Sequence, residues 1–154
     1  MFKDITPLLL DREALAHTAG ELAAYAREHE ADYVVSAEAR GFVLGGALAV
    51  QAGAGFILAR KPGRLPSATD SVEYELEYGL DSLEVHSDAM RGGARVLVHD
   101  DLLATGGTAA ALCHLVEGAG GVVAGCAFVI ELGFLHGRER LRGHDVRSLV
   151  VYDG

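Results

Sequence analysis

Two adjacent carboxylates, Asp100 and Asp101, stand between an apolar run and a turn rich in glycine and threonine, in the segment VLVHDDLLATGGTAA. The turn ATGGT, residues 104–108, offers hydroxyls and backbone N–H groups at the start of a predicted helix, where the helix dipole favours phosphate. Bare carboxylates repel phosphate, whereas an ionised carboxylate accepts hydrogen bonds from the vicinal hydroxyls of a ribose. The segment therefore predicts a sugar phosphate ligand, with its phosphate on the turn and its hydroxyls on the acid pair.

A purely structural interpretation of this segment is also open. In that interpretation the strand simply ends on two acids, and Thr108 caps the helix that follows. Short turns of Gly and Thr are common, so the turn alone favours neither interpretation. The acid pair favours the ligand, because an ordinary turn does not require two carboxylates beside it.

Apolar runs alternate with helical patterns along the chain, which predicts an α/β fold with a mainly parallel central sheet flanked by helices. We expect one domain over residues 1–154. The predicted helices cover residues 12–29, 41–51 and 108–117, and the predicted strands cover residues 32–37, 55–60, 94–99, 121–132 and 147–153. Residues 61–71, KPGRLPSATDS, have a mobile-loop composition, and residues 72–85, VEYELEYGLDSLEV, alternate as a hairpin does.

Three predicted strands are followed by unusual polar residues: Glu38 to Arg40, Arg60 with Lys61, and Asp100 with Asp101. In open α/β sheets, ligands bind beyond the carboxyl ends of the strands. We therefore expect these three groups to meet at one edge of the sheet. Taken alone, Arg60 and Lys61 are also typical of a solvated strand end.

The bulk composition limits the class of partner. The net charge of −9 argues against a nucleic acid or a membrane surface as the partner, because both need a basic face. Cys113 and Cys126 lack metal or redox spacing, which favours two reduced, buried thiols in a cytoplasmic protein. We find no signal peptide and no apolar run of the roughly 18 residues that a membrane span needs.

The segment VLVHDDLLATGGTA resembles the phosphoribosyl-pyrophosphate signature of the type I phosphoribosyltransferases, and DDLLATGGT is similar to the form found in the adenine branch of that family. Five further blocks resemble the rest of the family pattern in the same order: FKDITPLL, EARGF, RKPGRLP, LEYGLDSLEV and IELGFLHGRERL. The resemblance covers nearly the whole chain. It implies the type I phosphoribosyltransferase fold, with a flexible flap hairpin over about residues 61–88.

The resemblance also implies roles for the residues that match family motifs. Asp100 and Asp101 would hold the ribose hydroxyls. The residues implied for the 5-phosphate form the turn: Ala104, Thr105, Gly106, Gly107 and Thr108. Those implied for the pyrophosphate are cations, Arg40, Arg60 and Lys61, and the family has a cis peptide bond in the segment that matches Glu38–Ala39–Arg40.

The remaining implied roles concern the base and the proton transfer. Glu77 matches the catalytic acid–base residue on the flap, with Tyr78 beside it, and Phe2 and Lys3 match the segment that sandwiches and reads the purine. Without the resemblance, Glu77 would be interpreted as a solvated hairpin charge, because several other acidic residues lie close to it in the sequence.

Two positions depart from the family pattern. The family usually has further residues ahead of the block that begins MFKDITP, which indicates either a translation start set too late or a reduced N-terminal hood over the purine. His99 stands where the family usually has an apolar residue. Both a satisfied core histidine and a new neighbour of the acid pair are open interpretations.

The function implied is purine salvage: adenine and phosphoribosyl pyrophosphate give AMP and pyrophosphate in a cytoplasmic homodimer. Mg²⁺ would be held by the substrate and water near Asp100 and Asp101, without a dedicated protein site. One alternative is transfer to xanthine, hypoxanthine or guanine. The other is a regulator that senses phosphoribosyl pyrophosphate without catalysis, against which the presence of Glu77 and the flap block argues.

Overall fold

The computed structural model describes residues 4–66, 69–76, 79–86, 88–90 and 92–154. Five parallel strands form its main sheet in the order β2-β1-β5-β6-β7. Their bounds are β1 Tyr33–Ala37, β2 Gly55–Ala59, β5 Arg95–Leu103, β6 Val122–Leu132 and β7 Val146–Tyr152. The strand that carries the acid pair, β5, is therefore the central one.

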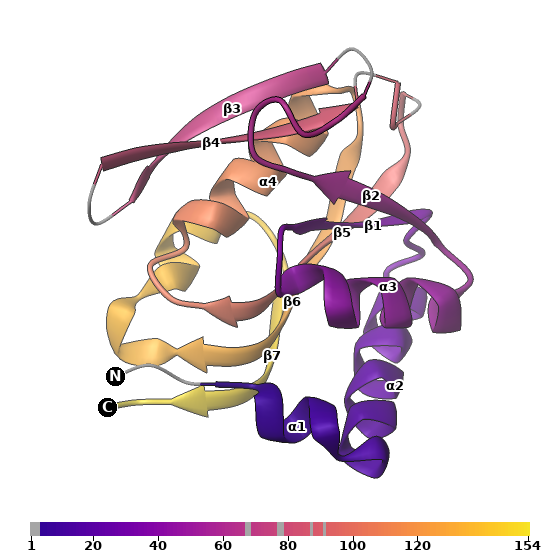
Figure 1. Ribbon diagram of the computed structural model, residues 1–154, viewed down its shortest axis with the longest axis vertical. Helices are drawn as coiled ribbons and strands as arrows, with labels where there is room; N and C mark the ends of the chain where they lie inside the picture. The colour runs from indigo at the N-terminus through magenta and orange to yellow at the C-terminus, as the bar shows by residue number, and fades with distance from the viewer. Residues whose placement is uncertain (1–3, 67–68, 77–78, 87, 91) are drawn as a thin grey trace.

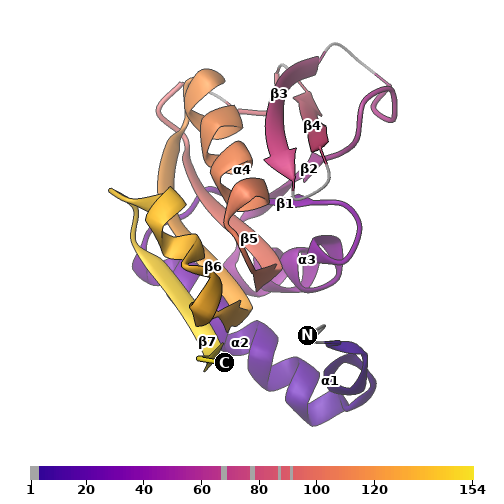
Figure 2. The same ribbon diagram turned by 90° about the vertical axis from the view of Figure 1, so that its left-hand side faces the viewer.

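Helices cover both faces of this sheet (Figures 1 and 2). On one face, α2 (Arg12–Glu28) and α3 (Gly41–Ala52) bury an apolar layer that includes Leu44 and Leu97. On the other face, α4 (Gly107–Gly118) packs in a layer that includes Val98 and Leu112. The predicted fold, a mainly parallel sheet flanked by helices, is confirmed. Among the described residues, no helix is both long enough and apolar enough to span a membrane.

The predicted hairpin is present as β3 (Thr69–Leu76) and β4 (Gly79–His86), which pair antiparallel and lie beside α4 (Figure 2). Its base is joined to the end of β2. The N–H of Arg60 donates to the carbonyl of Glu84 at 2.9 Å, and the N–H of Glu84 donates back at 2.7 Å. The hairpin is thus connected by backbone hydrogen bonds to one of the strand ends that carry the predicted site.

Strand β5 is longer than predicted. The prediction ended it at His99, but pairing with β6 continues through Asp100, opposite Phe128, to Leu103, opposite Glu131. The long, largely buried strand β6 offers a backbone partner beyond the point where β5 itself turns polar, so the two acids lie within a central strand. Short helices at α1 (Thr6–Leu10), η1 (Gly133–Leu135) and η2 (Gly137–Leu141) are not predicted from the sequence, and α4 begins one residue before its predicted start.

Helix α3 approaches β1 closely because glycine faces the sheet. A Cβ added at Gly45 would lie 2.5 Å from Ser36 Oγ and 2.9 Å from Phe56 Cε1. The next residue, Gly46, has no heavy atom within 4 Å of the same position. This close packing fixes the N-terminal end of α3, and with it the loop that joins β1 to α3.

We predict opposite effects for alanine at these two neighbouring glycines. Alanine favours a helix interior over glycine by about 1 kcal/mol, so Gly46→Ala should raise the free energy of unfolding by up to that amount. Gly45→Ala should instead lower it by about 1–3 kcal/mol, because the added methyl overpacks the contact with Ser36. Urea unfolding of both variants measures the difference, and equal effects would contradict close packing at Gly45.

Candidate functional site

The acid pair lies at the carboxyl edge of the sheet, in a setting that fixes both carboxylates. Asp101 is 3% exposed and Asp100 is half-buried. The N–H of Asp101 donates to Asp100 Oδ1 at 2.8 Å. The start of α3 also abuts this group, since a Cβ at Gly41 would lie 2.9 Å from Asp100 Oδ1. The Asp100 carboxylate is thus held by a backbone N–H on one side and abuts the start of α3 on another.

The turn predicted to hold a phosphate, residues 104–108, lines a hollow of about 70 Å³ together with Asp100. Helix α4 begins there, and its N-cap residue, Gly106, has φ 89°, in the left-handed region that favours glycine. Within the described residues no side chain caps this helix, so the interpretation of Thr108 as the cap is wrong. The first N–H groups of α4 are therefore left for an anion.

The end of the block IELGFLHGRERL, to which the sequence analysis gave no role, closes the back of this turn. A Cβ at Gly106 would lie 2.5 Å from the carbonyl oxygen of Gly137, at the start of η2, and 3.2 Å from Arg140 Cβ. The same segment is anchored to β6 through Arg138, whose Nε donates to the two carboxylate oxygens of Glu131 at 2.8 and 3.1 Å. The available signal was its place directly after β6, whose carboxyl end lies at the same edge of the sheet.

A second hollow, of about 250 Å³, adjoins the acid pair. Its lining residues come from all three predicted strand ends and include Glu38, Arg40, Lys61, Asp100 and Asp101. The peptide bond between Glu38 and Ala39 is cis, as the resemblance implied. The predicted convergence of the three polar groups at one edge of the sheet is confirmed.

Glu38 organises the cations around this hollow, a role that the sequence analysis did not give it. Its Oε1 accepts the N–H of Lys61 at 2.6 Å and lies 3.5 Å from Arg60 Nε. Across the hollow, Arg40 Nε lies 3.5 Å from Asp101 Oδ2. The site therefore sets the side chains of Arg40 and Arg60 against carboxylates, with Lys61 also lining the hollow, an arrangement suited to a ligand that carries both phosphates and hydroxyls.

Asp100 has an unusually high pKa for an aspartate. Burial raises the pKa of Asp100 well above the ordinary value for aspartate, and a hydrogen bond and charge from Asp101 raise it further, while Arg40 opposes the shift. Hydrogen-bond donors and positive charge brought by a ligand would favour the ionised form.

His99 is fully buried in β5, two residues before Asp101. Its Nδ1 lies 2.9 Å from the carbonyl oxygen of Ala127 on β6. Burial lowers the pKa of His99 to about 4, although that hydrogen bond and the charge of Asp101 oppose the shift. His99 is therefore a core histidine that also lies close to the acid pair. Its hydrogen bonding is incomplete, because only Nδ1 has a partner among the described residues.

Four predicted site residues, Phe2, Lys3, Glu77 and Tyr78, lie outside the described residues. Their roles in base recognition and proton transfer stay predictions. The strands that flank positions 77 and 78 are described, and β4 is the strand bound to Arg60.

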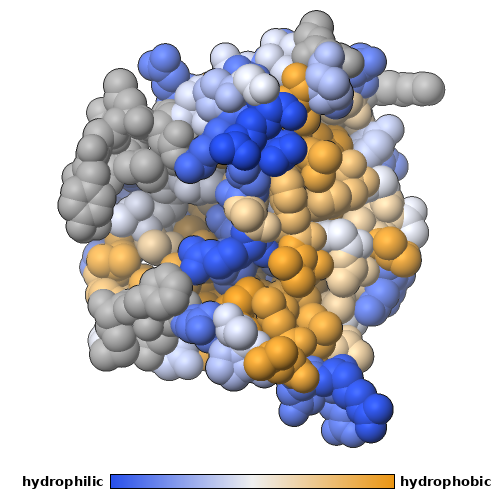
Figure 3. Space-filling view, viewed as in Figure 1, coloured by the Kyte–Doolittle hydropathy of each residue, from blue (hydrophilic) through white to orange (hydrophobic). Residues whose placement is uncertain are grey.

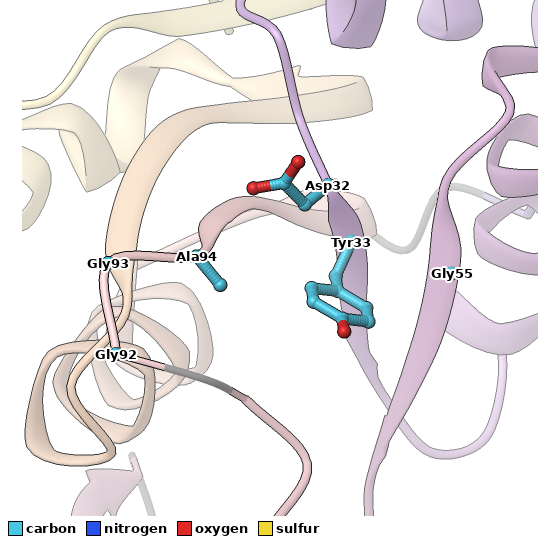
Figure 4. A pocket seen from close by; sticks show the side chains of 6 residues that line it. All are labelled: Asp32, Tyr33, Gly55, Gly92, Gly93 and Ala94. Carbon is cyan, nitrogen blue, oxygen red and sulfur yellow. The ribbon is translucent and has the colours of Figure 1, made fainter.

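Another hollow, of about 520 Å³, lies at the opposite edge, where the strands begin (Figure 4). The described residues that line it are Asp32, Tyr33, Gly55, Gly92, Gly93 and Ala94, and none of these six is basic. The carboxylate of Asp32 already accepts the N–H of Arg95 at 2.9 Å. A phosphorylated ligand needs positive charge or free N–H groups, so the chemistry places the candidate site at the carboxyl edge.

Comparisons with known proteins give the same picture across the whole chain. The family model for the phosphoribosyl transferase domain matches residues 8–151. Adenine phosphoribosyltransferase from Rubrobacter xylanophilus is 61% identical over 153 residues, which are 99% of this chain and 83% of that protein.

Two solved structures show the likeness in three dimensions. The adenine phosphoribosyltransferase from Thermoanaerobacter pseudethanolicus is 50% identical with a TM-score of 0.95, covering 98% of this chain and 88% of that one. The enzyme from Saccharomyces cerevisiae, complexed with an imino-altritol bisphosphate and adenine, is 36% identical with a TM-score of 0.91, covering 96% and 86%.

We predict that Asp100→Asn stabilises the ligand-free protein, and more so as the pH rises. Folding raises the pKa of Asp100, so this carboxyl binds more protons in the folded state than in the unfolded state. The free energy of unfolding therefore falls as the pH rises above about 4, the pKa of aspartate in the unfolded chain. Asparagine removes that ionisation. Thermal unfolding across the acid-to-neutral range should show a gain that grows with pH, whereas Asp70→Asn, at an exposed position, should show none. A gain independent of pH would contradict the account.

Proposed function

Because the chain belongs to the phosphoribosyl transferase domain family, we propose that it transfers the phosphoribosyl group of phosphoribosyl pyrophosphate to N9 of adenine, giving AMP and pyrophosphate. One observation carries this proposal: a carboxylate pair suited to a diol lies directly before an uncapped helix N-terminus suited to a phosphate. The adenine preference is supported by the relatives and solved structures described above. The proposal treats residues 1–154 as one domain that serves purine salvage, with the cytoplasm as its predicted location.

The acid pair and the turn hold the two parts of the ribose 5-phosphate. Asp100 and Asp101 accept hydrogen bonds from the ribose hydroxyls, and the N–H groups and hydroxyls of residues 104–108 donate to the 5-phosphate. Glycine at position 106 allows the backbone to take the left-handed conformation that the turn needs. Fixing the sugar at both ends orients C1 for displacement, which lowers the entropic part of the barrier.

The cations act on the leaving group. Breaking the bond between C1 and pyrophosphate builds positive charge on the ribose and negative charge on the pyrophosphate. Arg40, Arg60 and Lys61 stabilise that negative charge, and Glu38 holds Arg60 and Lys61 in place for this purpose. Preorganised charges of this kind contribute several kcal/mol to transition-state stabilisation.

Base recognition and proton transfer are assigned to residues outside the described part of the chain. Glu77 exchanges a proton with the purine ring as N9 forms its new bond, which in general contributes roughly 10²–10⁴-fold in rate. Tyr78 lies beside it, and Phe2 and Lys3 contact the purine. The hairpin closes over the ribose and keeps water from the cationic centre. Support for this closure is the joining of β4 to Arg60, which connects the hairpin to the pyrophosphate side.

Mg²⁺ is the metal that this site suits. The carboxylate oxygens of Asp100 and Asp101 are hard donors of the kind that Mg²⁺ prefers. Among the described residues, no three His, Cys, Asp or Glu side chains gather as a complete metal site, so substrate oxygens and water would supply the other ligands. When bound, the ion neutralises charge on the pyrophosphate.

The proposal also includes a homodimer, formed through α3 and β2. Three large aliphatic side chains stand in water there: Val43 and Val50 on α3 are 50% and 82% exposed, and Leu58 on β2 is 41% exposed. Figure 3 shows apolar side chains gathered over this side of the molecule. Apolar surface of this kind is typical of an interaction site, and the same patch on a second copy would bury it by twofold symmetry.

Turnover with each purine base tests the proposed function. With phosphoribosyl pyrophosphate and Mg²⁺ present, the purified chain should convert adenine to AMP. Its kcat/KM for adenine should be at least about 100-fold above that for hypoxanthine, guanine or xanthine. The reason is that protein groups placed to hydrogen-bond the edge of adenine are left without partners when a different purine is bound. Glu77→Gln, prepared identically, controls for contaminating enzyme and should retain phosphoribosyl pyrophosphate binding while losing most of kcat.

The other outcomes of this assay separate the alternatives. Preference for a 6-oxo purine would replace adenine as the substrate. Binding of phosphoribosyl pyrophosphate without turnover of any base would indicate a sensor instead of an enzyme.

A further inference from the structure

Two buried polar atoms beneath the acid pair have no hydrogen-bond partner among the described residues: Nε2 of His99 and Oγ of Ser36. Both residues are 0% exposed. They stand directly opposite each other in the parallel pairing of β5 with β1. Because a buried, unpaired polar group costs about 1–3 kcal/mol, two such groups on paired residues call for an explanation.

The chemistry of the two atoms is complementary. The carbonyl oxygen of Ala127 can only accept, so the hydrogen of the neutral His99 ring is on Nδ1 and Nε2 presents a lone pair. The Ser36 hydroxyl carries a hydrogen that it can donate. Side chains alternate along a strand, so Ser36 shares the face of Val34, and His99 shares the face of Leu97. Val34 and Leu97 lie in the same apolar layer under α3, so the hydroxyl and the ring lie on one face of the sheet.

The position of this pair within the sheet gives it a specific consequence. The pairing of β1 with β5 ends at Ser36 and His99. Beyond that point one strand leads into the loop of residues 38–40, and the other continues into the acid pair. A Cβ at Gly41 would lie 2.9 Å from Asp100 Oδ1 and 3.4 Å from Ser36 Cβ, so the same helix start touches both strands there.

We propose that Ser36 and His99 are positioning residues for phosphoribosyl pyrophosphate. The Ser36 hydroxyl donates to one buried water that in turn donates to Nε2 of His99, and this link sets the spacing between the loop of residues 38–40 and the acid pair. The inference rests on the proposed function, in which one ligand meets the loop with its pyrophosphate and the acid pair with its ribose. Neither residue touches the substrate, and both act through the two strand ends that they join.

Steady-state kinetics with single variants tests the positioning role. Ser36→Ala and His99→Leu should each raise the KM for phosphoribosyl pyrophosphate about 3- to 10-fold, the equivalent of one hydrogen bond, with kcat and the KM for adenine little changed. His99→Gln keeps a hydrogen-bond acceptor near the position of Nε2, so its KM for phosphoribosyl pyrophosphate should be close to that of the wild type. Thr18→Val, which removes a buried hydroxyl from α2 away from both hollows of the site, is the matched control and should change neither constant. An unchanged KM in Ser36→Ala would overturn the positioning role.

The double variant tests the link itself. Each single change breaks the same interaction, so the effects of Ser36→Ala and His99→Leu should not add. In the double variant, the KM for phosphoribosyl pyrophosphate and the loss in free energy of unfolding without ligand should match those of the more affected single variant. Additive losses would overturn the link. If calorimetry shows that the wild-type chain does not bind phosphoribosyl pyrophosphate, the proposed function fails. In that case, the free energies of unfolding of the wild type, the two single variants and the double variant still decide whether the link exists.

Discussion

The site depends on holding two neighbouring carboxylates side by side in a buried strand, although their charges repel. Pairing of β5 with β6 keeps the backbone extended through Asp100 and beyond it. The start of α3 abuts Asp100, and Arg40 lies 3.5 Å from Asp101. Burial nevertheless raises the pKa of Asp100, because the ionised form of this carboxyl is poorly solvated. Under the proposed function, hydroxyl donors and a cation that arrive together would favour the ionised form of Asp100, and we therefore expect the site to prefer a diol that carries a metal ion.

The same edge of the sheet also has to bind phosphates, and the structure separates the two tasks in space. The carboxylates lie within β5, whereas the uncapped N–H groups lie after the turn at the start of α4. On the other side of the acid pair, Glu38 gathers Arg60 and Lys61. Since Arg60 is also joined to β4, the cations that we propose for the leaving group and the hairpin that we propose as a cover for the ribose are connected through backbone hydrogen bonds.

The sequence was sufficient for those features that follow from local pattern. The apolar runs predict parallel strands, parallel strands bring their carboxyl ends together, and the polar residues after three strands are found around one hollow. Asp11 caps α2 by accepting the N–H groups of Glu13 and Ala14, as an aspartate directly before a helix commonly does. Features that need a partner distant in sequence were not predictable: the continuation of β5 along β6, the contact of Gly137 with Gly106, and the pairing of Ser36 with His99.

The central claim is that the acid pair binds the ribose diol while the turn binds the phosphate. Calorimetric titration of ribose 5-phosphate and 2-deoxyribose 5-phosphate, with Mg²⁺ present, tests it on the wild type and on the Asp100→Asn, Asp101→Asn double variant. The account predicts that the wild type binds the ribose form about 10-fold more tightly or better, because charged acceptors bind the diol, and that the double variant binds both sugars weakly and equally. A wild type that does not distinguish the two sugars, or a double variant that still does, would contradict it.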